Sequence, residues 1–149
     1  MTDDAASLAE RILADVMARD PASARGLGIT VEWARPGHVR LACVVRPEMV
    51  HSQGVCHGAY LFGLADTACA FAAMARNEYV LTQTAHVTFL SPARAGERLV
   101  AEAVEVARTR RGGTYDVRVS GPDGRLVLLL RGLCRTTGRA ILPAAGAEG

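Results

Sequence analysis

Several features that mark other classes of protein are absent from this chain of 149 residues. Its net charge is only +2, without a long basic tract, so we expect no nucleic-acid partner. Its first twenty residues are acidic and amphipathic, unlike a signal peptide. Its four cysteines are scattered and form no C-x-x-C pair; they are Cys43, Cys56, Cys69 and Cys134. Scattered cysteines are typical of reduced thiols in a cytoplasm, where we place the protein.

No apolar run predicts a membrane span. The longest run, residues 57–75, is interrupted by Asp66 and followed by Arg76. Half of the residues are hydrophobic and 21% are charged, which is typical of a globular domain with a sizeable core. Because no linker or internal repeat divides the chain, we expect one domain over residues 25–137, a helical lead-in over 1–24 and a flexible tail over 138–149.

The run over residues 57–75 is the segment around which the chain is organised. It lacks proline and is long enough for about five helical turns. It is apolar on every face, which predicts a helix wrapped by protein. The single carboxylate of Asp66 must therefore be paired, hydrogen-bonded, protonated or directed at a cavity. At the helix start, Gly58 leaves bare N–H groups that suit a carbonyl oxygen or an anion.

The flanking segments predict a leading helix over residues 3–19 and six strands. The strands are expected over 27–34, 38–46, 80–90, 97–108, 114–120 and 125–135, with turns at 36–37 and 121–124. The apolar run 127–130 predicts a last strand that is buried on both faces. An antiparallel sheet curled around the apolar helix would bury that helix efficiently, so the fold class is α+β.

The block MVHSQGVCHGAYLFGLADTACAFAA resembles the signature of hotdog-fold thioesterases of the phenylacetic-acid-degradation (PaaI) type. The later segments FLSPARAGERLVAEAVEV and GGTYDVRVSGPDGRLVLLLRG resemble the strands and closing hairpin of the same family, so the resemblance spans residues 25–136. It implies an antiparallel sheet wrapped around a long central helix. It also implies hydrolysis of an acyl-coenzyme A thioester with no metal and no other cofactor.

The resemblance also implies roles for single residues. Gly58 would donate its backbone N–H to the thioester carbonyl, Asp66 would attack or activate water, and Thr82 would help to hold that water. The asparagine of the family falls on His51 and the second glycine of its HGG falls on Ala59, and these are two departures. His51 could replace the asparagine as a polar positioner, act as a base, or mark an altered substrate or reaction.

Further residues have both a structural and a functional interpretation. His57 shapes the loop beside the substrate, and Tyr60 and Leu61 either line the acyl pocket or belong to the core. Arg94 and Arg110 either meet the phosphates of coenzyme A or lie on the surface as solvated charges.

Neither a metal site nor a cysteine nucleophile is expected near the helix start. The spacing of His51, Cys56 and His57 matches no common ligand pattern. Neighbours in sequence rarely form a cysteine–histidine pair, so Cys56 is interpreted as a small packing residue.

The distance between the two central candidates predicts a dimer. Eight residues of regular helix separate Gly58 from Asp66 by roughly 12 Å, so one carbonyl cannot contact both in one chain. A two-fold dimer with antiparallel helices would bring each Asp66 to the partner subunit's Gly58, and a second exposed sheet face favours a homotetramer.

The predicted substrate is a phenylacetyl-CoA, hydroxyphenylacetyl-CoA or other medium-sized acyl-CoA thioester. Two alternatives stay open. One is a hotdog acyl-CoA hydratase or dehydratase, in which His51 would work with an acid, and the other is a non-catalytic acyl-CoA sensor.

Overall fold

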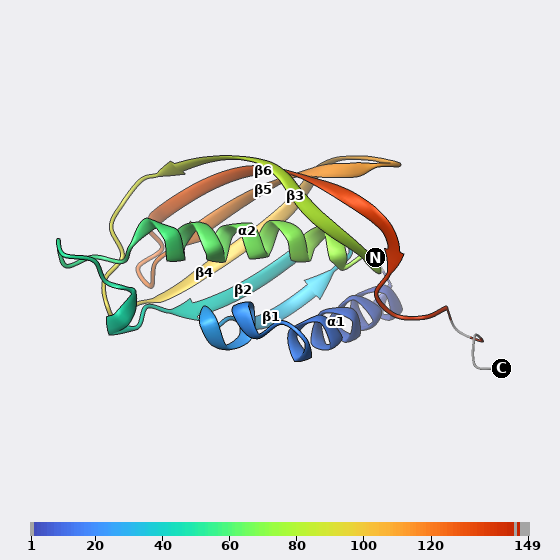
Figure 1. Cartoon of the computed structure of the whole chain (residues 1–149), viewed down its shortest axis with the longest axis horizontal. Coiled ribbons are helices and arrows are strands. Elements are labelled where there is room, and N and C mark those ends of the chain that lie inside the picture. The colour runs from blue at the N-terminus through green and yellow to red at the C-terminus, as the bar shows by residue number, and fades with distance from the viewer. Residues whose placement is uncertain (1, 145, 147–149) are drawn as a thin grey trace.

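The structure, a computed structural model, describes residues 2–144 and 146 (Figure 1). It begins with helix α1 (Asp3–Ala18) and a π-helical turn (Ala22–Gly26). Strands β1 (Thr30–Arg35) and β2 (His38–Val44) and a 3₁₀ turn (Pro47–Met49) precede the long helix α2 (Gly58–Met74). The strands that follow are β3 (Glu78–Phe89), β4 (Arg98–Thr109), β5 (Gly112–Ser120) and β6 (Leu126–Ala140).

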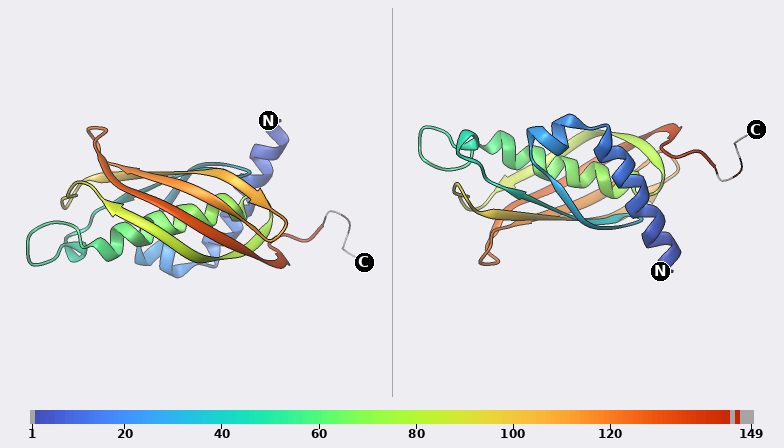
Figure 2. Two further views of the ribbon diagram at one scale, coloured as in Figure 1. Left: turned by 90° about the horizontal axis from the view of Figure 1, so that it is seen from above. Right: turned by 90° about the horizontal axis from the view of Figure 1, so that it is seen from below.

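The strands form one antiparallel sheet in the order β1-β2-β4-β5-β6-β3. The sheet curls around α2, while α1 lies at the β1 end of the sheet (Figures 1 and 2). The predicted α+β architecture, a sheet wrapped around a central helix, is therefore confirmed. No helix among the described residues is long and apolar enough to cross a membrane.

Small side chains allow α2 to approach the sheet closely. A Cβ atom placed on Gly132 of β6 would lie 2.5 Å from Cys69 Sγ of the helix. The core-facing side of α2 is fully buried, with Leu64 and Phe71 among its largest residues. One stripe of α2, which carries Phe62 and Asp66, is only half-buried in one chain.

Two predicted element boundaries are wrong. The first strand begins at Thr30 rather than at position 27, because the chain after Pro21 continues as the π-helical turn. The last strand continues to Ala140, so the predicted tail cannot begin at position 138. Beyond this strand, the side chain of Asn77 exchanges two hydrogen bonds with the backbone of Leu142, at 2.8 and 3.1 Å. Positions 145 and 147–149 of the predicted tail lie outside the described residues.

The apolar run of β6 is also less buried than predicted. Val127, Leu128 and Leu130 are buried, but Leu129 is only half-buried. It is paired with Arg118 of β5, an exposed residue. The face of the sheet turned away from α2 is therefore partly open to solvent at this point.

Candidate active site

The loop over residues 50–57 fixes the start of α2 by hydrogen bonds to the rest of the fold. Its tip is a turn in which Gly54 N donates to His51 O at 2.9 Å, and Gly54 takes a φ of 84°. This left-handed conformation is one that glycine adopts at little cost. Towards the helix, Cys56 N donates to Ala93 O at 2.7 Å. The loop therefore holds His51 and the first turn of α2 in a defined relation.

The first N–H groups of α2 are unequal in their hydrogen bonding. His57 is the N-cap, and its Nδ1 atom accepts from Ala59 N at 2.9 Å. The carbonyl oxygen of His57 accepts from Tyr60 N at 3.0 Å and from Leu61 N at 3.5 Å. The N–H of Gly58 has no partner among the described residues. One uncommitted donor therefore remains at the positive end of the helix dipole.

A cavity of about 390 Å³ lies next to this donor. Most of its lining is apolar; it is formed by His51, Val55, Cys56, Gly58, Leu61, Phe89, Leu90, Ser91 and Pro92. Phe89 comes from the end of β3, and a Cβ atom on Gly58 would lie 3.3 Å from its ring. Glycine therefore leaves the N–H accessible beneath an aromatic ring. The lining has two side chains that can form strong hydrogen bonds with a ligand, those of His51 and Ser91. The Ser91 hydroxyl already donates to Leu126 O at 2.7 Å.

The carboxylate of Asp66 is held in the middle of α2 with one oxygen unsatisfied. Its Oδ1 atom is buried and accepts no hydrogen bond from the described residues. A buried acceptor without a partner costs roughly 1–3 kcal/mol, more for a charged group, so the position is costly unless another molecule supplies a donor.

Thr82 of β3 lies in the neighbourhood of Asp66. Its hydroxyl is 3.9 Å from the Cys134 thiol, which is 3.5 Å from the thiol of Cys69. The hydrogen bond with Cys134 and burial raise the pKa of Cys69, and the charge of Asp66 acts in the same direction. The Thr82 hydroxyl and the charge of Asp66 thus both act on one pair of buried thiols, and the water-holding role of Thr82 stays a prediction.

The thiol of Cys56 does not have the character of a nucleophile. Burial raises its pKa to about 11, so it is protonated at neutral pH. The rings of His51 and His57 meet edge to face, with centroids 6.0 Å apart. Within residues 2–144 and 146, no three histidine, cysteine, aspartate or glutamate residues gather as metal ligands would.

The remaining predicted residues fall in different places. Leu61 lines the cavity at Gly58, whereas Tyr60 is half-buried against the core and Ala59 is exposed. Arg94 is exposed two residues after Pro92 of the cavity wall. Arg110 lies in the β4–β5 turn, which with Arg76 forms a hollow beyond the C-terminal end of α2. One chain therefore does not bring Arg110 to Gly58.

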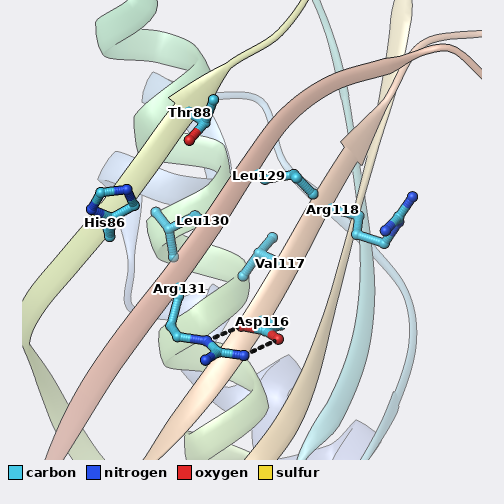
Figure 3. Close-up of a pocket in the computed structure, with 8 residues that line it drawn as sticks. All are labelled: His86, Thr88, Asp116, Val117, Arg118, Leu129, Leu130 and Arg131. Carbon is cyan, nitrogen blue, oxygen red and sulfur yellow. Dashed lines mark hydrogen bonds and ion pairs between the residues drawn. The ribbon is translucent and has the colours of Figure 1, made fainter.

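A second hollow of about 450 Å³ lies on the face of the sheet turned away from α2 (Figure 3). In its lining the guanidinium of Arg131 makes two hydrogen bonds of 2.7 Å to the carboxylate of Asp116. These bonds lower the pKa of Asp116. The sheet separates this hollow from Gly58 and Asp66, so we do not assign it to the active site.

Phe89 is one of the cavity residues that the sequence did not single out; the others are Val55, Leu90, Ser91 and Pro92. Its ring reaches Gly58 only because the end of β3 crosses over the start of α2. The short motif Phe-Leu-Ser-Pro at the end of a strand was its one visible signal.

Comparison with known proteins gives consistent results. Residues 53–128 match the family model of the thioesterase superfamily. Acyl-coenzyme A thioesterase PaaI of Escherichia coli is 30% identical over 128 residues, which are 86% of this chain and 91% of that protein. The structure of E. coli PaaI, from the phenylacetic acid degradation operon, matches with a TM-score of 0.86 at 29% identity, over 91% of this chain and 98% of that one.

Two further relatives extend the comparison. A variant of the phenylacetic acid degradation protein PaaI from Thermus thermophilus matches with a TM-score of 0.71 at 35% identity, over 75% of this chain and 96% of that one. A protein of Archaeoglobus fulgidus, provisionally named an esterase, is 34% identical over 98 residues. That alignment spans 66% of this chain and 64% of the relative, slightly less than two thirds of its length.

Proposed function

Because this chain belongs to the thioesterase superfamily, we propose that it hydrolyses acyl-CoA thioesters to the free acid and coenzyme A. The observation that carries the proposal is the uncommitted N–H of Gly58, which faces an apolar cavity at the N-terminus of α2. A thioester carbonyl oxygen placed there would accept this hydrogen bond. The oxygen gains negative charge as the carbonyl carbon is attacked, and the helix dipole favours that charge.

The acid in this reaction is Asp66 of the partner subunit. The roughly 12 Å of helix between Gly58 and Asp66 exclude a shared substrate carbonyl within one chain. In an antiparallel pair of helices, each carboxylate would reach the carbonyl held at the other subunit's Gly58. There it would either attack the carbonyl carbon and form an anhydride that water then hydrolyses, or remove a proton from a water molecule whose oxygen attacks that carbon. In both routes the C–S bond breaks, and the thiolate of coenzyme A leaves and takes up a proton.

The exposed edge of the sheet supports this dimer. β3 is the last strand of the sheet that the described residues form, so its outer backbone groups have no strand to pair with in this part of the chain. Leu81 and Phe89 of this strand are 69% and 52% exposed. Pairing of β3 with the β3 strand of a second copy would continue the sheet, cover these residues and the half-buried stripe of α2, and set the two helices side by side. We propose a homodimer as the catalytic unit.

The other face of the sheet supports a proposal of further assembly. Val104 and Val106 of β4 and Leu133 of β6 are all exposed in one chain. We propose that two dimers meet to form a homotetramer. We also propose a cytoplasmic location, which the four free, buried cysteines support.

The cavity supports an apolar acyl group of medium size. Its volume of about 390 Å³ lies within the range typical of small-molecule sites, and Leu61, Phe89 and Leu90 supply an apolar and aromatic wall. Together with the similarity to E. coli PaaI, this favours phenylacetyl-CoA or a hydroxyphenylacetyl-CoA. Arg94 and, across the dimer, Arg110 of the partner subunit are candidates for the phosphates of coenzyme A.

The experiment that tests this function measures thiol release from a panel of acyl-CoA thioesters. We expect turnover by the wild type and a loss of about 100-fold or more in kcat for Asp66→Asn, with acyl-CoA binding retained. Asp123→Asn, in the exposed β5–β6 turn, is a matched control that keeps full turnover. A wild-type protein that binds acyl-CoA without cleaving any thioester would contradict hydrolysis, and an active Asp66→Asn would contradict the role of the acid.

A further inference from the structure

The ring of His51 has one nitrogen that is occupied and one that is free. Its Nδ1 atom accepts a hydrogen bond from the backbone N–H of Gln53 at 3.0 Å. An acceptor nitrogen carries no proton, so the proton of the neutral ring is on Nε2. Nε2 has no hydrogen-bond partner among the described residues, and the ring lines the cavity at Gly58.

His51 is the one strong side-chain donor in the described lining that is not already used. The hydroxyl of Ser91 donates to Leu126 O, as described above. The thiol of Cys56 is a weak donor and points to His57 O at 3.7 Å. The Nε2–H of His51 is therefore the strong side-chain donor that the described lining offers to a carbonyl oxygen, beside the backbone N–H of Gly58.

The hydrogen bond from Gln53 to His51 also explains how histidine can stand where the family has asparagine. An asparagine side chain commonly accepts from the backbone N–H two residues later, in an Asx turn. Nδ1 of His51 makes the same bond to the same position of the loop. In this comparison Nδ1 replaces the amide oxygen, and Nε2–H replaces the amide N–H.

We infer that His51 donates a second hydrogen bond to the thioester carbonyl through Nε2–H, beside that of Gly58, and does not act as a base. This rests on the proposed function and assigns one role among the three that the sequence leaves open. For Nε2 to accept a proton as a base, the neutral ring would carry its proton on Nδ1. Two N–H groups, those of Nδ1 and Gln53, would then face each other, and the loop would lose its hydrogen bond.

Three variants separate the donor from the turn. His51→Asn keeps both the donor to the carbonyl and the hydrogen bond of the turn, since its NH₂ group donates and its amide oxygen accepts from Gln53 N–H. His51→Asp keeps the turn but has no proton to donate once ionised. His51→Ala loses both. We expect His51→Asn to retain most of the wild-type kcat, and His51→Asp and His51→Ala to lose about 100-fold to 1000-fold in kcat. KM should change less than kcat, because a carbonyl donor binds the transition state more strongly than the substrate.

Thermal unfolding and gel filtration show whether each variant keeps its fold and assembly. If His51→Ala does not fold, the test rests on His51→Asn and His51→Asp, which both keep the hydrogen bond from Gln53. If His51→Asn loses as much kcat as His51→Asp, the ring does something that an amide cannot, and the inference is wrong. If His51→Asp retains as much as His51→Asn, the turn alone matters, and the inference is again wrong. A wild type that cleaves no thioester overturns the proposed function and this inference together. If the wild type is active and one of these two results is found for His51→Asn and His51→Asp, only the inference is overturned.

Discussion

Replacing Gly58 by alanine separates a functional glycine from a packing glycine. The backbone of Gly58 is not in the left-handed region, so an alanine fits it without strain. The added Cβ would lie 3.3 and 3.4 Å from two atoms of the Phe89 ring. Because that ring is 52% exposed, it can move by the few tenths of an ångström that the contact requires. The fold should therefore tolerate the methyl group.

The expected effects on stability and on activity differ in size. Alanine favours a helix over glycine by up to about 1 kcal/mol, which opposes the cost of the tight contact. The change in Tm should then stay within about 4 °C. The methyl group, however, occupies the space between the Gly58 N–H and the Phe89 ring, where the carbonyl must lie. The N–H itself remains, but a carbonyl kept away from it loses the hydrogen bond, and loss of one such bond typically costs about 100-fold to 1000-fold in kcat.

Gly63→Ala provides a matched control on the same helix. A Cβ atom on Gly63 would lie 3.3 Å from two methyl groups of Leu27, so the steric contact is similar, but it is remote from the cavity. Thiol-release kinetics and thermal unfolding are measured for both variants. We expect Gly63→Ala to keep turnover and Gly58→Ala to lose it at nearly the same Tm. Alanine keeps the backbone N–H, so a fully active Gly58→Ala would refute the placement of the thioester carbonyl between that N–H and the Phe89 ring.

Two further predictions concern the dimer and the cysteine of the cavity. Leu81→Glu places a charge on the exposed β3 edge, so sedimentation should show more monomer, and turnover should fall with the dimer fraction. A fully active monomer would disprove an active site shared between two subunits. Cys56→Ala should keep turnover, because the wild-type thiol is protonated at neutral pH. Burial raises the pKa of Cys56 to about 11, so its contribution to stability is complete below the unfolded-state pKa of about 8.5 and is lost as pH rises towards 11. The Tm of the wild type should fall over this alkaline range, and an equal fall in Cys56→Ala would contradict that cause.

The fold was largely predictable because its main signals are local. A long apolar run with a glycine at its start predicts α2, and the β-branched run after it predicts β3. The element boundaries were mispredicted where contacts between distant parts of the chain determine them. β6 continues to Ala140 because it pairs with Glu78 at the start of β3, and no local pattern near position 138 indicates that pairing. Likewise, the π-helical turn after Pro21 replaces the beginning of the first predicted strand.

The candidate site was predictable to the extent that its distances follow from a single helix. The spacing of Gly58 and Asp66 alone shows that one chain cannot place both at one carbonyl, and the structure adds the uncommitted N–H and the unsatisfied carboxylate oxygen. The sequence could not choose among the roles of His51, because the choice depends on which ring nitrogen the loop occupies. Nor could it place Phe89 over Gly58, since β3 and α2 meet there only in the folded sheet. Helical spacing thus predicts the need for a second chain, whereas the donors and walls of the cavity depend on how the loop and the strand fold around the helix start.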